Sequence, residues 1–114
     1  MDNIEPVLAH ESGLPPALIE KLKRKHGQLW LIEIAPEIVG DATLEFVFKK
    51  PDRKILSAVA KVGRTDEVEA GYVLLVNCLV WGEKEHLDDI QVFSALSQKM
   101  EALNAPRTAT IKNL

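Results

Sequence analysis

The segments QLWLIEIA (residues 28–35) and ATLEFVFK (residues 42–49) show the apolar alternation of β-strands. The loop between them holds Pro36, Gly40 and Asp41, so it is short enough to join two antiparallel strands as a hairpin. Successive side chains of a strand point to opposite faces of its sheet. One face of the hairpin is therefore predicted to be apolar, built from Trp30, Ile32, Ile34, Leu44, Phe46 and Phe48.

The opposite face of the hairpin is predicted to be only partly polar. Leu29, Leu31 and Val47 fall on it, beside Glu33, Thr43 and Glu45. A two-stranded hairpin is marginally stable alone in water. We therefore expect it to pack against helices of its own chain and against another chain.

Helical spacing flanks the hairpin on both sides. Leucines recur every fourth residue from Leu14, and Gly27 ends that helix. After the hairpin, Pro51 and Asp52 begin a helix. Asp66, with Glu69 three residues later, begins a second helix, which is apolar on nearly all sides and continues to Leu79. A last helix has capping-box spacing at Asp88 and Gln91. The expected fold is α+β, with an N-terminal helix, a two-stranded antiparallel β-hairpin and a three-helix C-terminal bundle.

A chain of 114 residues is the usual size of one domain. We expect a single α+β domain over residues 14–105, a flexible N-terminal arm over residues 1–13 and a flexible tail over residues 106–114.

Composition argues against several functional classes. The net charge of -3 does not favour nucleic-acid binding, which leaves a basic footprint, and the basic residues between Lys21 and Lys25 suit the end of a helix. The N-terminus lacks the features of a signal peptide, and no apolar run approaches the ~20 residues of a membrane span. Cys78 is the one cysteine, which suits a reducing compartment. We expect a cytoplasmic protein that binds neither nucleic acid nor membrane.

The sequence offers little for catalysis. Cys78 and His86 are eight residues apart, which does not match the close spacing of zinc ligands. The glycines stand singly, so none forms a phosphate-binding loop, and the carboxylates of Glu83, Glu85 and Asp88 fit a solvated loop and a helix cap. We expect no metal, no cofactor and no enzymatic activity.

The order of several short motifs resembles a known family. FKKPDR (residues 48–53) ends the hairpin, DEVEA (residues 66–70) begins the helix that reaches Asn77 and Cys78, and GEKE (residues 82–85) leads to the final helix. Over residues 26–114 this order is similar to that of the small tail assembly chaperones of long-tailed bacteriophages and prophages.

The resemblance implies a non-enzymatic role in the cytoplasm of a bacterial host. Such chaperones hold the aggregation-prone tape-measure protein until tail-tube subunits polymerise around it. No catalytic residues or cofactors are implied. The alternative is a small structural subunit of a phage particle, such as a tail or head-completion protein.

The hairpin is also the predicted contact surface. Its two strand edges are expected to be unpaired, and such edges attract other chains. The stretch from Lys49 to Lys54 fits either a polar corner or a basic contact for an acidic partner. We expect the tape-measure protein, a tail-tube subunit or a second copy of this chain to bind at Leu29, Leu31, Val47, Lys49, Lys50 and Arg53.

Overall fold

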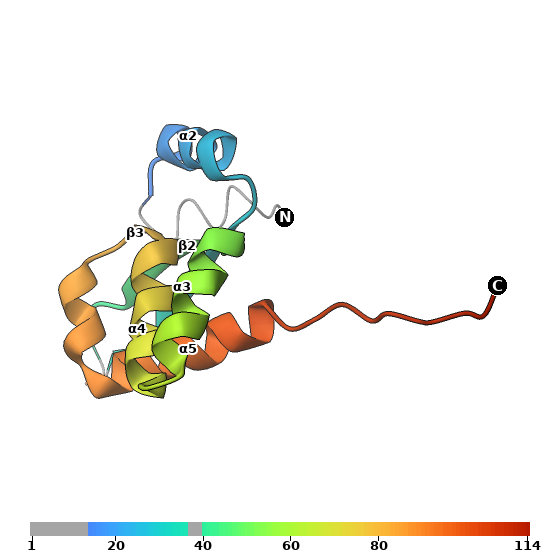
Figure 1. Cartoon of the computed structure of the whole chain (residues 1–114). Coiled ribbons are helices and arrows are strands. Elements are labelled where there is room, and N and C mark those ends of the chain that lie inside the picture. Colours follow the sequence, from blue (N-terminus) through green and yellow to red (C-terminus); the bar gives the residue numbers. More distant parts are fainter. Residues whose placement is uncertain (1–13, 37–39) are drawn as a thin grey trace.

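The expected hairpin is present and belongs to a three-stranded antiparallel sheet (Figure 1). The computed structural model describes residues 14–36 and 40–114; the predicted arm over residues 1–13 lies outside this part. Its elements, in chain order, are α2 (Pro16–His26), β1 (Leu29–Ile34), β2 (Leu44–Lys49), α3 (Arg53–Gly63), α4 (Glu67–Cys78), β3 (Leu79–Trp81), the 3-10 helix η1 (Lys84–Asp88) and α5 (Ile90–Leu103).

Strand β3 corrects the expectation of a two-stranded hairpin with two open edges. It pairs with β2, Val47 opposite Trp81 and Phe48 opposite Leu79, so the strand order is β1-β2-β3. Leu79 was expected to continue the preceding helix, but its backbone is extended (φ -71°, ψ 119°) and the helix ends at Cys78. Three apolar residues directly after an apolar helix carry no signal that separates strand from helix. Within the described chain, β1 keeps an open edge and β2 does not.

The predicted apolar face of the hairpin lies against the core. Ile32 pairs with Phe46, and Trp30 with Phe48, so these side chains share one face. Both phenylalanine rings are fully buried, 6.4 Å apart between centroids, and each contributes about 2–3 kcal/mol of hydrophobic stabilisation. The rest of this core comes from the second half of the chain: Leu75, Cys78, Leu87, Val92, Leu96 and Met100.

Aspartate side chains begin three helices. The Asp52 carboxylate accepts a hydrogen bond from the backbone N–H of Ile55, 2.9 Å away, and Asp66 accepts one from Glu69 at 3.0 Å. The cap of α5 is Asp89, which accepts from Gln91 at 2.9 Å, and not Asp88 as expected. Asp88 is already part of η1, so the helix starts one residue later. Each such cap is worth about 1 kcal/mol.

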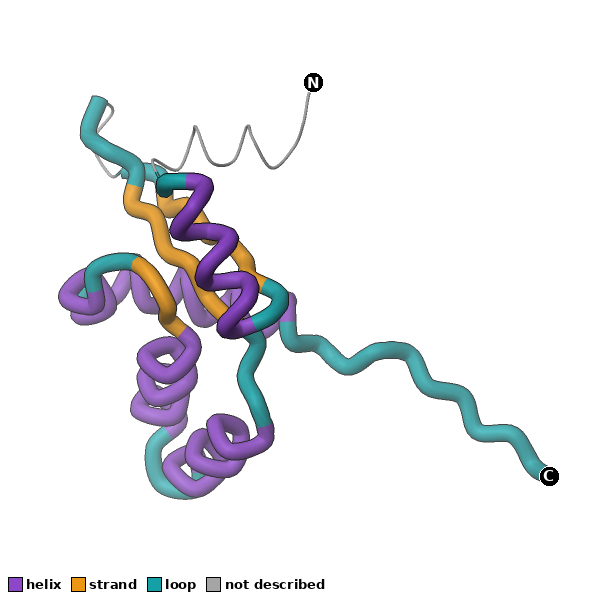
Figure 2. Tube along the Cα trace, turned by 90° about the horizontal axis from the view of Figure 1, so that it is seen from above, coloured by secondary structure: helices purple, strands orange, loops and turns teal. Residues whose placement is uncertain are grey.

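Helices cover both faces of the sheet. Helix α5 runs along the core face, while α2 lies over the opposite face and contacts β1 (Figures 1 and 2). Helix α3 packs along α4. Beyond Asn104 the chain has neither helix nor strand and extends away from the body; we call residues 105–114 the C-terminal arm.

Gly82 allows β3 to leave the sheet beside Phe46, which gives a stability test. Its φ is +126°, and an added Cβ would lie 2.9 Å from Phe46 Cδ1 and 3.1 Å from the Glu45 carbonyl oxygen. We expect Gly82→Ala to lower the free energy of unfolding by about 3 kcal/mol in urea denaturation, from backbone strain plus this clash.

Gly40→Ala is the matched control. Its φ is +101°, but an added Cβ would meet no atom of the described residues within 4 Å, so the free energy of unfolding should fall only by the strain, about 1 kcal/mol. Equal losses for the two variants would show that the packing of Gly82 on Phe46 is not tight.

Candidate functional site

The predicted contact surface on the hairpin is divided in the structure. Val47, opposite Leu31 in the β1–β2 pairing, is only 4% exposed. Leu29 and Leu31 are half-buried on the strand that α2 contacts. Val47 is therefore an interior residue, which corrects its assignment to a contact surface. Lys50 and Arg53 are exposed and Lys49 half-buried, and a contact role for the five remaining residues stays a prediction.

Two glutamates face each other across the same side of the hairpin. Glu33 and Glu45 are directly opposite in the pairing of β1 with β2. Burial raises the pKa of the Glu45 carboxyl, and the negative charge of Glu33 raises it further. Its Oε2 atom is buried and makes no hydrogen bond to the described residues. Like charges at directly opposed positions destabilise a sheet, so this pair weakens the fold at neutral pH.

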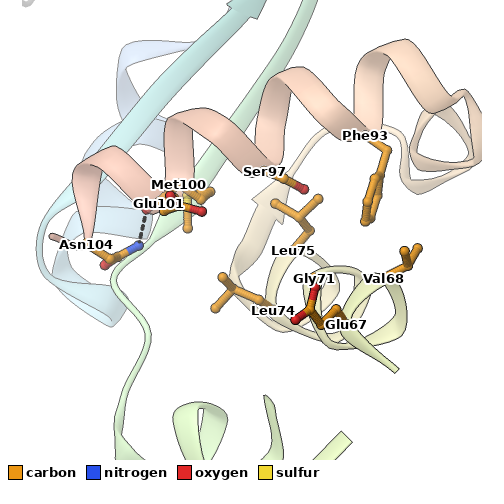
Figure 3. Close-up of a pocket in the computed structure, with 10 residues that line it drawn as sticks. All are labelled: Glu67, Val68, Gly71, Leu74, Leu75, Phe93, Ser97, Met100, Glu101 and Asn104. Carbon is orange, nitrogen blue, oxygen red and sulfur yellow. Dashed lines mark hydrogen bonds between the residues drawn. The ribbon is translucent and has the colours of Figure 1, made fainter. Parts of the chain in front are cut away.

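A groove lies between α4 and α5 in the described chain (Figure 3). Its volume is about 460 Å³, within the range of ligand-binding pockets. One wall comes from α4 and the other from α5. The lining residues are Glu67, Val68, Gly71, Leu74 and Leu75 of α4, and Phe93, Ser97, Met100, Glu101 and Asn104 of α5.

The groove has an apolar floor and an exposed apolar rim. Leu75 and Met100 are fully buried, so they belong to both the core and the floor. Val68, on the rim, is 66% exposed. Leu74 and Phe93 are half-buried, so apolar side chains stay partly accessible along the groove.

Gly71 sets how closely the two helices approach. An added Cβ there would lie 3.2 Å from Phe93 Cζ and 3.8 Å from Ser97 Oγ. Gly71 is therefore a point of close packing between α4 and α5. Sequence periodicity could not predict the groove, because it indicates which side chains face the core but not how far apart two helices lie.

The polar groups of the groove are few and lack a positive charge. Glu67 and Glu101, one on each wall, are exposed (Figure 3). Ser97 Oγ is buried and makes no hydrogen bond within the described chain. Asn104 Nδ2 donates to the Met100 carbonyl oxygen at 2.8 Å. The groove therefore suits an apolar segment with basic neighbours.

The remaining reactive side chains do not gather around this groove. Cys78 is buried, and desolvation raises the pKa of its thiol to about 11. Within residues 14–36 and 40–114, no three His, Cys, Asp or Glu side chains are placed to hold a metal ion. Among the helices that the structure describes, none combines the length and apolar composition that a bilayer crossing requires.

Comparison with known proteins supports the fold alone. No family model and no curated protein matches the sequence. Among solved structures, the chain is similar to an uncharacterised protein of Bacillus stearothermophilus, with 23% identity and a TM-score of 0.55 over 82% of this chain and 99% of the other.

The opposed glutamates predict a pH dependence of stability. A carboxyl whose pKa is raised on folding binds its proton more tightly in the folded state than in the unfolded state. The free energy of unfolding therefore rises as the pH falls through the folded pKa, and this contribution is absent at pH values above it. We expect Glu45→Gln to add about 0.5 kcal/mol at pH 7 and to reduce the gain between pH 7 and pH 5, measured by urea denaturation.

Glu33→Gln is the control. It removes the repulsion but leaves Glu45 buried, so it should retain part of the pH dependence. A loss of stability at pH 7 in Glu45→Gln would mean that the Glu45 carboxylate is held by a favourable interaction.

The burial of Cys78 predicts slow thiol labelling. With a pKa of about 11, about one thiol in a thousand is ionised at pH 8, and the sulfur is fully buried. We expect an aromatic disulfide reagent to label the folded protein at least 100-fold more slowly than the protein in denaturant. Cys78→Ala supplies the blank, and complete labelling within minutes in native buffer would contradict this placement.

Proposed function

We propose that this chain is a non-enzymatic assembly chaperone of a phage or prophage tail, acting in the cytoplasm of the bacterial host. Its client is the tape-measure protein, and the α4–α5 groove holds an amphipathic helix of that client. The observation that carries the proposal is the groove itself, with its apolar floor, exposed Val68 and acidic walls.

The shape of the groove favours a helical client. An amphipathic helix presents apolar anchors at positions i, i+3, i+4 and i+7, which a groove between two helices accepts along its length. Val68, Leu74 and Phe93 offer apolar contacts, while Glu67 and Glu101 attract basic residues beside the client's apolar stripe. Tape-measure proteins are expected to present such helices, which links the geometry to the family resemblance.

The alternative is a structural subunit that stays in the particle, with a tail-tube subunit as its partner. Both roles need a surface that binds another protein. They differ in the fate of the protein: a chaperone is absent from finished particles, while a subunit remains there. Immunoblotting of purified particles against the assembling lysate distinguishes the two.

Substitution at the groove rim tests the client site. Val68 is exposed, so Val68→Glu should leave the fold intact while adding a charge beside an apolar contact. We expect it to weaken binding to a co-expressed tape-measure segment at least tenfold, about 1.4 kcal/mol, measured by calorimetry on the purified components.

Leu56→Glu is the matched control, and Leu31→Glu tests the alternative contact surface on the hairpin. Leu56, on α3, is 51% exposed and does not line the groove, so its substitution should change affinity less than twofold. Leu31 tests the hairpin surface. If Leu31→Glu abolishes binding and Val68→Glu does not, the hairpin is the client site and the groove is not.

A further inference from the structure

The C-terminal arm carries two large apolar side chains, Ile111 and Leu114, that its own body leaves uncovered. Ile111 is 98% exposed, and the arm extends away from the helices (Figures 1 and 2). Arg107 and Lys112 flank it, and residues 105–114 include no acidic side chain. The arm therefore combines basic and apolar side chains, which match the acidic and apolar side chains that line the α4–α5 groove.

We propose that the arm of one copy of this chain docks into the α4–α5 groove of a second copy, so that two copies associate by exchanging arms. Ile111 fills the apolar part of the groove, and Arg107 and Lys112 lie near the carboxylates of Glu67 and Glu101. The inference concerns self-association and goes beyond the proposed function. Because the groove is shared, an arm and a client helix exclude each other from it.

The direction in which the arm leaves α5 favours the groove of a second copy over its own. Asn104 lines the groove and fixes the end of α5, since both its backbone N–H and its Nδ2 donate to the Met100 carbonyl oxygen. Pro106 restricts Ala105 to extended backbone. To enter its own groove, the chain would have to reverse within these residues. Continuing outward instead, the seven residues from Ala105 to Ile111 reach about 23 Å.

The charges on the two surfaces provide a test in trans. The groove-reversed variant is Glu67→Lys with Glu101→Lys, and the arm-reversed variant is Arg107→Glu with Lys112→Glu. All four residues are exposed, so the fold should survive, which circular dichroism checks. In sedimentation velocity at 100 µM in low salt, we expect the wild-type chain to dimerise and each variant alone to associate at least tenfold more weakly.

An equimolar mixture of the two variants decides between groove docking and other arrangements. Each arm then meets a groove of opposite charge, so the mixture should form a 1:1 heterodimer. A wild-type chain that stays monomeric, or a mixture that does so, overturns the proposal, because an arm in its own groove gives no dimer. A dimer that the arm-reversed changes leave intact overturns it as well.

The apolar anchor is tested separately. Ile111→Asp should weaken the dimer at least tenfold, while Thr108→Asp, which adds the same charge on the same arm, should weaken it less than threefold. Equal effects would mean that charge alone holds the arm, against an apolar docking site. These measurements contain no client, so their failure leaves the proposed client binding untouched, and failure of client binding leaves the dimer unaffected.

Discussion

The burial of Phe46 and Phe48 on the central strand is the constraint on which the rest of the structure depends. Both rings are fully buried, and strands pair on either side of β2. Covering one face of so small a sheet requires α5, η1 and the end of α4, all from the second half of the chain. The hairpin alone cannot fold, so the helices exist in their observed positions because they shield these two rings.

The groove follows from the same constraint. Leu75 and Met100 must reach the core beneath β2, so α4 and α5 are held by their inner faces. They approach closely where Gly71 meets Phe93, and the groove lies beside that contact. Among the helices of the described residues, α3 packs along α4 and α2 contacts β1, so neither covers the groove. The groove is therefore a consequence of how the core is built.

Sequence patterns predicted the features that depend on local periodicity. The alternation of Ile32, Phe46 and their neighbours gave the correct buried face, and the capping box at Asp66 gave the correct start of α4. Asp52 was expected in the first turn of α3 and is instead its cap. The predictions that failed concerned features that depend on packing between segments far apart in the sequence. Strand β3 is three residues long and forms only because β2 offers an edge, and Val47 is buried although its face is partly polar. The groove depends on a helix separation that no periodicity encodes.

Nuclear magnetic resonance of methyl groups tests most directly whether the groove is the protein-binding site. With methyl-labelled protein and a tape-measure segment, the account predicts shifts at Val68, Leu74, Leu75 and Met100, which line the groove. The methyls of Leu29 and Leu31 on β1 should stay unchanged. Shifts confined to β1 and α2, with the groove methyls unaffected by a bound client, would contradict the account.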